Sequence, residues 1–274
     1  MTATLERRLL WHSLRVDGDP RVVDQLATLL PDARHPVPAC RAMHYTATRP
    51  SGGDELTLTE EGDALDVVAG ATAAADAIHV RAHRRAFELA SLAGWARLHA
   101  ATVDLDDSRV LIVGPSGAGK TTLAVRLLLD GADVQGDESV LVRRGVTLAV
   151  PRALHLKPGA ARWLPELLDV VPTLPVVGDV TVLDPARLGR PLVLREASVD
   201  HVVLLGGPDP DGVDCADLDG GAVLEALLTD AFPLTETKAR MVSVVAGAMV
   251  HARGHRLTSG PPGAMVEALR RAIR

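Results

Sequence analysis

Residues 110–122 read VLIVGPSGAGKTT: an apolar run ending at Val113, a glycine-rich turn, and the start of a helix at about Lys120. The turn matches the pattern G-x-x-x-x-G-K-[ST], in which glycines let successive backbone N–H groups converge on phosphate oxygens. The helix N-terminus adds a favourable dipole, the lysine reaches the β- and γ-phosphates, and the next hydroxyl binds Mg²⁺. The sequence therefore predicts a nucleoside-triphosphate site formed by Gly114, Ser116, Gly117, Ala118, Gly119, Lys120, Thr121 and Thr122.

The surrounding pattern places this turn in an α/β domain, because strands alternate with helices from residue 98 onward. Strands are expected at 98–105, 109–113, 133–135, 140–143, 147–150, 201–205 and 251–257, and helices at 121–129, 221–229, 235–248 and 262–273. The first part of the chain has the pattern of a small α+β unit, with strands at 8–16, 42–48, 55–59 and 64–68 and helices after Asp19-Pro20 and at 82–98. We therefore expect two domains: residues 1–97, which could bind a substrate or partner, and residues 98–274, which carry the P-loop.

Composition narrows the class of protein further. The chain has 274 residues, 47% of them hydrophobic, and a formal charge of −6 from 29 basic and 35 acidic residues. An acidic balance argues against a nucleic-acid partner, which would favour a basic surplus. Because no apolar run reaches the length of a membrane span and no signal-peptide pattern opens the chain, we expect a cytoplasmic protein with no membrane partner.

Accessory residues separate the classes of P-loop protein. The chain contains no asparagine, so it lacks the N-K-x-D motif that a GTPase needs, and it has no L-S-G-G-Q-type segment of a transporter ATPase. The carboxylate pair close behind the P-loop is Asp137-Glu138, seventeen and eighteen residues after Lys120. This pair follows the strand at 133–135, so it is expected at the carboxyl end of a sheet strand, on the side where α/β ligands bind.

The segment 98–157 resembles the HPr kinase/phosphorylase family, in particular its shorter relatives in peptide-modification (lasso-peptide) gene clusters. Three spaced features carry the resemblance. His99 stands fifteen residues before Gly114, the P-loop follows the family pattern apart from Pro115 and Thr121, and the acidic pair has the family spacing.

The resemblance implies a P-loop kinase core that transfers the γ-phosphoryl group of ATP (or GTP), with Mg²⁺, to a hydroxyl. The acceptor it implies is a serine of a peptide or protein, with ribosomal precursor peptides as the favoured case. Asp137 would act as the base and His99 would lie beside it, with Lys120 completing the catalytic group. Glu138 would support Mg²⁺ together with Thr121 and Asp137. Longer members of the family assemble as oligomers, so a homo-oligomer is a further expectation.

The chain also departs from the longer family members. It has no later glycine-rich stretch preceded by a Glu-Arg pair, which argues against HPr itself as the substrate. Residues 150–159 instead read VPRALHLKPG, where Arg152 and Lys157 are candidates for clamping a phosphate or an acidic substrate.

A basic cluster (Arg81, His83, Arg84 and Arg85) is either a solvated helix face or a surface for an acidic peptide. Two other functions stay open: a kinase of a small hydroxyl metabolite, and a non-catalytic module that is switched by nucleotide.

Overall fold

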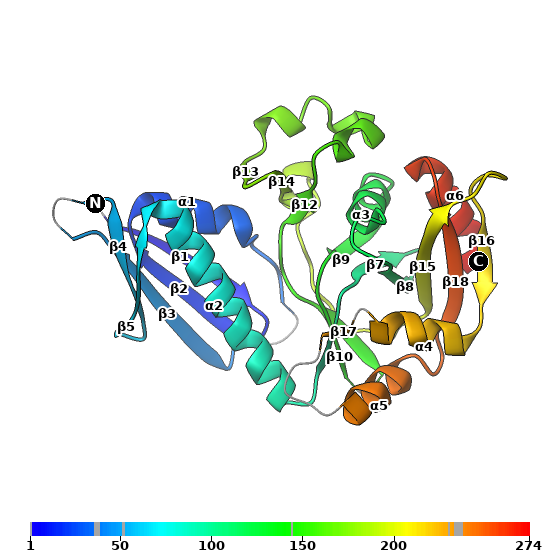
Figure 1. Ribbon diagram of the computed structural model, residues 1–274, viewed down its shortest axis with the longest axis horizontal. Coiled ribbons are helices and arrows are strands. Elements are labelled where there is room, and N and C mark those ends of the chain that lie inside the picture. The colour runs from blue at the N-terminus through cyan, green and yellow to red at the C-terminus, as the bar shows by residue number, and fades with distance from the viewer. Residues whose placement is uncertain (1, 36–38, 51–52, 144, 230, 233–237) are drawn as a thin grey trace.

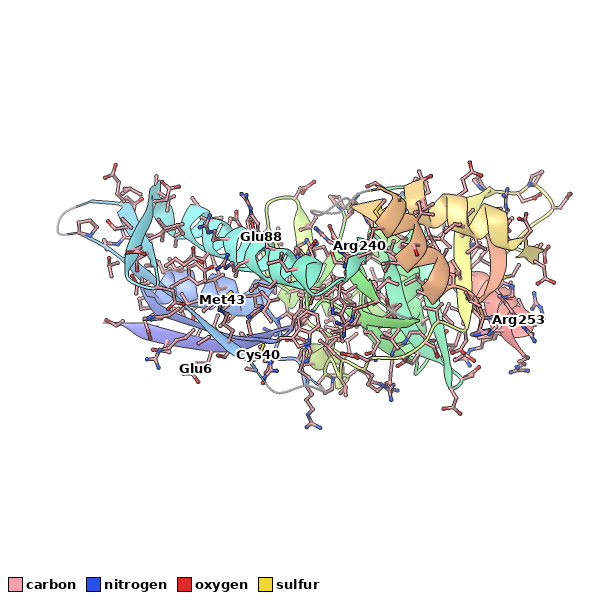
Figure 2. The ribbon with its side chains drawn as sticks, turned by 90° about the horizontal axis from the view of Figure 1, so that it is seen from below. Glu6, Cys40, Met43, Glu88, Arg240 and Arg253 are labelled. Carbon is pink, nitrogen blue, oxygen red and sulfur yellow. The ribbon has the colours of Figure 1, made fainter. Side chains whose placement is uncertain are left out.

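The computed structural model describes residues 2–35, 39–50, 53–143, 145–229, 231–232 and 238–274. Two lobes lie side by side along the long axis of the molecule (Figure 1). Figure 2 shows the same arrangement from below, with Glu88 in the first lobe and Arg253 at the far end of the second. The predicted α/β architecture, with sheets flanked by helices and a small α+β unit at the N-terminal end, is confirmed.

The first lobe is a mixed five-stranded sheet covered on one face by two helices. The sheet has the order β1-β2-β3-β4-β5, and only β2 and β3 run parallel, joined through α1. Helix α1 begins where predicted, because the Asp19 carboxylate accepts a hydrogen bond from the Arg21 backbone N–H at 2.9 Å and Pro20 occupies the first turn. The elements are β1 (Ala3–Leu9), β2 (His12–Gly18), α1 (Pro20–Leu29), β3 (Arg41–Thr48), β4 (Glu55–Glu60), β5 (Asp63–Ala69) and α2 (Gly70–Leu92).

Two sequence predictions in this lobe are wrong. The stretch 8–16 is not one strand: it contains the end of β1, the turn and most of β2, and the hairpin reverses at Leu10, a residue with a φ of 52°. The helix expected at 82–98 begins at Gly70 and ends at Leu92. Its N-terminal end has no side-chain cap, so the sequence carries no start signal there, and Ala-rich sequence supplies the helix propensity instead.

The second lobe is built on a six-stranded sheet of order β16-β18-β15-β8-β7-β9. Helices α3 and α6 pack on one face and α4 on the other, as the two apolar clusters on opposite sides of β8 show. Strand β8 alternates accordingly, with Val110 and Ile112 in one cluster and Leu111 and Val113 in the other. The elements are β7 (Ala101–Leu105), β8 (Ser108–Val113), α3 (Lys120–Leu129), β9 (Asp133–Gly136), β15 (His201–Pro208), β16 (Cys215–Leu218), α4 (Gly220–Thr229), α5 (Lys238–Ala248), β18 (Arg253–Ser259) and α6 (Pro262–Ile273).

A four-stranded sheet of order β11-β10-β6-β17 joins the two lobes. On β10, Leu141 belongs to the core of the first lobe, whereas Val140 and Val142 belong to the core beneath α4 and α5. The strand expected at 98–105 is therefore two strands in two sheets, β6 and β7. The remaining elements are β6 (Ala96–Leu98), β10 (Val140–Arg143), β11 (Val146–Ala149), β17 (Ala231–Phe232), a small sheet of β12 (Leu154–Leu156), β13 (Val176–Val177) and β14 (Val180–Leu183), and the 3₁₀ turns η1 (Ala160–Trp163), η2 (Pro165–Leu167), η3 (Val171–Thr173) and η4 (Pro185–Leu188).

Within the described residues, none of the helices combines the length and apolar character that a membrane crossing requires. Of the helix expected at 235–248, residues 235–237 lie outside the described part of the chain.

Candidate functional site

The glycine-rich turn connects the end of β8 to the start of α3. Gly117 and Gly119 have φ angles of 85° and 98°, a conformation that side-chain-bearing residues avoid. A Cβ atom at either position would meet nothing within 4 Å, so the backbone faces open space there. No side chain caps α3, and its first-turn N–H groups therefore point toward this same loop. The remaining predicted loop residues lie as expected, with Gly114, Ser116 and Ala118 in the turn and Lys120, Thr121 and Thr122 in the first helical turn.

Lys120 is held against the loop that it is predicted to serve. Its side chain is buried, and the ammonium donates hydrogen bonds to the carbonyl oxygens of Gly114 at 2.5 Å and Pro115 at 3.3 Å. A second ammonium approaches from outside: Lys157, directly after β12, donates to the Ser116 hydroxyl at 3.3 Å. Two of the chain's lysines therefore contact the same loop.

Asp137 reaches this loop because of the strand order. Strand β7 is antiparallel to both β8 and β9, so β8 and β9 point the same way and end at the same edge of the sheet. Asp137 follows β9 directly, and its Oδ2 atom accepts a hydrogen bond from the Thr121 hydroxyl at 2.8 Å. The structure thus joins the P-loop threonine to the predicted base.

The second oxygen of this carboxylate, Oδ1, is buried and has no hydrogen-bond partner. Burial raises the pKa of Asp137 to about 6, against the hydrogen bond from Thr121 and the charge of Arg152, which both lower it. A buried carboxylate oxygen without a donor costs free energy unless a ligand or ion meets it. Asp137 is therefore ionised near neutral pH and has one oxygen available for chemistry.

Glu138 has a different partner. Its carboxylate forms an ion pair with the Arg152 guanidinium, which also donates toward His155 Nδ1 at 2.7 Å. Burial and the charge of Arg152 lower the pKa of His155 to about 4, so that ring is neutral. Arg152 lies between β11 and β12, and the pair with Glu138 links this crossover to the acidic segment. The structure thus brings Arg152 to Glu138 and Lys157 to the loop.

His99 lies in the two-residue link between β6 and β7 rather than on a strand. The strand registers fix its neighbourhood, because Leu98 on β6 pairs with Val140 and Thr102 on β7 pairs with Gly136. The link that contains His99 therefore runs alongside the segment 137–139. The side chain itself is partly buried.

The oxygen atoms at this site have the chemistry that Mg²⁺ prefers. Mg²⁺ is bound by hydroxyl, carboxylate and phosphate oxygens, with few protein ligands and several waters. The Thr121 hydroxyl and the Asp137 Oδ2 atom that it contacts provide such oxygens, so the residues fit the ion. In the described part of the chain, no group of three or more His, Cys, Asp or Glu side chains could hold a metal by itself. The nucleotide's phosphates would have to complete the coordination.

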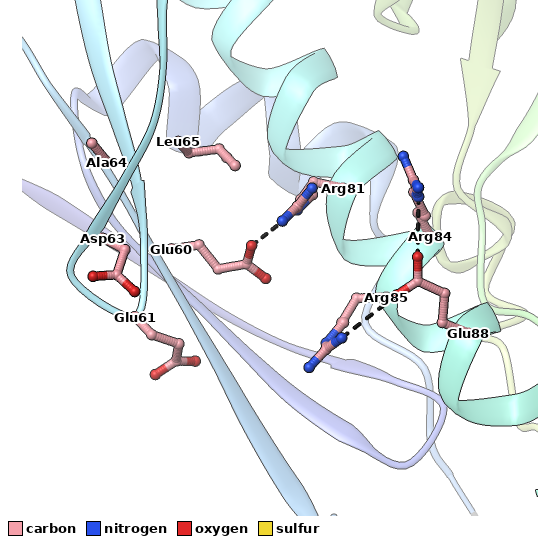
Figure 3. A pocket seen from close by; sticks show the side chains of 9 residues that line it. All are labelled: Glu60, Glu61, Asp63, Ala64, Leu65, Arg81, Arg84, Arg85 and Glu88. Atoms are coloured by element: carbon pink, nitrogen blue, oxygen red, sulfur yellow. Dashed lines mark hydrogen bonds and ion pairs between the residues drawn. The ribbon is translucent and has the colours of Figure 1, made fainter. Parts of the chain in front are cut away.

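The predicted basic cluster on α2 is neutralised by its neighbours. Figure 3 shows Arg81 directed toward Glu60, and both Arg84 and Arg85 directed toward Glu88. The three ion-pair distances, in that order, are 2.9, 3.1 and 3.5 Å. This face therefore carries closed ion pairs and little unbalanced positive charge.

Sequence reasoning missed a second group of polar residues near Asp137. Arg97, at the centre of β6, donates to the Ser139 hydroxyl from Nε at 3.0 Å and from Nη2 at 2.8 Å. Its guanidinium lies 4.0 Å from the centroid of the Phe87 ring on α2. Only the i, i+4, i+8 spacing of His79, His83 and Phe87 could have signalled one shared helix face, and it does not reveal what that face meets.

No family model matches the chain, and no curated protein matches it. Among solved structures, the chain is similar to the HPr(Ser) kinase/phosphatase from Coxiella burnetii, at 14% sequence identity and a TM-score of 0.35. The match covers 64% of this chain and 95% of that chain. At such low identity and TM-score, the site has to be understood from its own geometry.

Proposed function

We propose that the protein is a kinase that transfers the γ-phosphoryl group of ATP to a hydroxyl group, with a peptide or protein serine as acceptor. One observation carries the proposal: a buried carboxylate, Asp137, is hydrogen-bonded to the P-loop Thr121 and keeps one oxygen without a partner. A loop that only connected a strand to a helix would need neither open backbone amides nor a buried carboxylate oxygen without a partner, because burying such an oxygen costs free energy. The preference for a serine in a ribosomal precursor peptide rests on the sequence resemblance.

The P-loop supports the phosphate-binding half of the reaction. Loop amides and the uncapped N-terminus of α3 bind the phosphate oxygens. Lys120 exchanges its loop carbonyl partners for the β- and γ-phosphates, and Lys157 approaches from the Ser116 side. The Thr121 hydroxyl and Asp137 Oδ2 would hold Mg²⁺, which would supply charge neutralisation for the phosphates and leave Oδ1 to act as the base. Phosphoryl transfer depends mainly on such positioning and neutralisation.

The carboxylate supports the acceptor half. Asp137 Oδ1 accepts the proton of the acceptor hydroxyl as the new O–P bond forms. The bond between the γ-phosphorus and the bridging oxygen breaks, and its electron pair leaves on the β-phosphate of ADP, beside the Lys120 charge. His99 lies in the link beside the segment 137–139, Arg152 holds Glu138 within that segment, and together they position the base.

The test is mass spectrometry of candidate acceptors after incubation with Mg-ATP, comparing precursor peptides, protein serines and a pool of small hydroxyl metabolites. We expect Asp137→Asn to retain ATP binding and lose transfer by at least about 100-fold, the usual share of a general base. Lys120→Ala should abolish turnover. Asp133→Asn, an exposed position at the other end of β9, is the matched control and should transfer at the wild-type rate.

Two results would contradict the proposal. Wild-type transfer by Asp137→Asn would remove the base assignment. ATP binding without phosphorylated product from any acceptor would instead identify a nucleotide-switched binding module. Product on small metabolites alone would keep the kinase and reassign its acceptor.

A further inference from the structure

A second feature lies beside the segment 137–139, on the side of the first lobe. It is a cavity of about 580 Å³ between α2 and the strands that follow it. A cavity of this size is typical of small-molecule and peptide-side-chain sites. Its lining residues come from α2 and from the sheet that joins the two lobes or the residues next to that sheet: His79, Val80, His83, Arg84, Phe87, Glu88, Arg97, Ser139, Val150 and Arg152.

The lining of this cavity has an excess of positive charge. It contains three arginines; Arg84 is paired with Glu88 at the outer helix face and Arg152 with Glu138 just outside the lining, so three positive charges meet two carboxylates. Arg97 and Arg152 lie at the inner end of the cavity, where Arg97 contacts Ser139 and Arg152 is paired with Glu138. Burial and the charge of Arg152 lower the pKa of Arg97 and together outweigh the raising effect of Glu138, so an anion in the cavity would stabilise its charged form.

The two histidines add ring surface without charge. The rings of His79 and His83 are in contact, tilted by 58° with a centroid separation of 4.3 Å, and burial is the main cause that lowers the pKa of both rings, that of His83 to about 4. Both are therefore neutral near pH 7. The Phe87 ring and the Ser139 hydroxyl hold the Arg97 guanidinium in a fixed orientation. The cavity thus combines an aromatic wall with a preorganised cation.

The cavity and the proposed base share one short segment of chain. Ser139 lines the cavity two residues after Asp137, and Arg152, which also lines it, is paired with Glu138. The charge of Arg152 also lowers the pKa of Asp137, which shows that the two groups lie within electrostatic reach. A molecule seated in the cavity could therefore present a hydroxyl toward Asp137 while its other groups meet Arg97.

The neighbouring cavity provides an internal comparison. About 540 Å³ in volume, it lies between α2 and the β4–β5 hairpin (Figure 3). Its three arginines face four carboxylates, those of Glu60, Glu61, Asp63 and Glu88. The charge balance of this neighbouring cavity does not favour an anion, whereas that of the cavity lined by Arg97 and Arg152 does.

We propose that the cavity between α2 and β6 is the acceptor site, and that Arg97 and Arg152 select acceptors that carry a carboxylate next to the reacting hydroxyl. The proposal rests on the proposed kinase function and names its substrate class. The carboxylate can belong to a peptide or to a free hydroxy amino acid. In either case the N-terminal lobe forms one wall of the acceptor site.

The test compares matched acceptors that differ only in charge. Two acetylated and amidated tetrapeptides, Ala-Ser-Glu-Ala and Ala-Ser-Gln-Ala, form one arm, and free serine with serinamide forms the other. For the wild type we expect kcat/KM to be at least about 10-fold higher for the charged member of the preferred pair, the effect of one charge-assisted hydrogen bond. The arm that shows the ratio identifies the source of the carboxylate.

Variants then assign the preference to the cavity. Arg97→Gln should reduce the ratio to about 1 by raising KM for the charged acceptor, with KM for ATP unchanged, and Arg97→Lys should restore part of it. A merely structural role would weaken both acceptors equally. Arg81→Gln, which lines only the neighbouring cavity on the same helix, should keep the wild-type ratio.

The outcomes separate the two proposals. Transfer with equal kcat/KM for charged and neutral acceptors overturns the carboxylate selection and leaves the kinase intact. If no transfer occurs, the kinase proposal fails. Calorimetric binding of the same tetrapeptides then tests whether the cavity prefers a carboxylate. Preferential binding of the Glu peptide that Arg97→Gln abolishes supports it, and equal binding of both peptides overturns it.

Discussion

Replacing Asp137 by asparagine should stabilise the empty protein at pH 8. The carboxylate is 5% exposed, and burial raises its pKa from 3.8 to about 6. A tenfold change in a proton-binding constant corresponds to about 1.4 kcal/mol, so ionising Asp137 costs the native state about 3 kcal/mol relative to the unfolded chain. Asparagine keeps the shape and an acceptor for the Thr121 hydroxyl but carries no charge.

The sign of the pH dependence follows from which state holds the proton. Between about pH 4 and pH 6, native Asp137 keeps a proton that the unfolded chain has lost, so the free energy of unfolding falls as pH rises through this window. Above pH 6 the full penalty is present, and below pH 4 it is absent. The stability of Asp137→Asn relative to wild type should therefore grow by about 3 kcal/mol from pH 4 to pH 8.

The assay is urea unfolding of both proteins at several pH values, in EDTA and without nucleotide. In thermal unfolding the same difference should appear as about 6–12 °C at pH 8. Asp133→Asn, on the same strand but 59% exposed, controls for replacing a carboxylate. A stability difference that stays constant from pH 4 to pH 8, or a less stable Asp137→Asn protein at pH 8, would refute the buried-charge argument.

Three further predictions concern nucleotide binding and the stability of the first lobe. Lys157→Ala should raise KM for ATP about 10-fold, because its ammonium contacts the loop, and unchanged ATP kinetics would remove it from the site. Asp19→Ala should lower the free energy of unfolding by about 1–2 kcal/mol through loss of the α1 cap, measured by urea titration, and a loss below about 0.3 kcal/mol would contradict this role. Gly18→Ala should cost at least about 2 kcal/mol in the same assay, because its Cβ would stand 2.0 Å from the Ala47 carbonyl oxygen on β3, and wild-type stability would show that the strands can separate without cost.

Sequence patterns predicted elements whose signals are local. The cap at Asp19 marks the start of α1, and the glycines after Val113 mark the turn between β8 and α3. The sequence patterns failed where the chain has no turn-forming or capping residue. Leu10 turns the first hairpin without any turn-forming residue, and Gly70 starts α2 without a capping side chain. In both places tertiary packing decides the conformation.

The same distinction holds for the site. Residue order predicted that the pair Asp137-Glu138 lies at the carboxyl end of a sheet strand, on the side of the P-loop, and the family resemblance added the role of Asp137 as the base. Strand β9 runs parallel to β8 with β7 between them, and only the folded sheet shows this order. The unpartnered Asp137 oxygen and its raised pKa also required the structure, since burial is a sum over residues distant in the chain.

The sequence by itself determined the glycine-rich loop, its lysine and the acidic pair, because backbone freedom and residue order are properties of neighbouring residues. Only the tertiary structure decided that Arg152 pairs with Glu138 and that Arg97 joins it at a cavity formed against α2. Glu138 and Arg152 are fourteen residues apart and Arg97 precedes Glu138 by forty-one, and the packing of α2 against the sheet that contains β6 and β10 brings them together. The half of the site proposed to bind phosphate is therefore encoded locally, whereas the half proposed to select the acceptor exists only in the folded molecule.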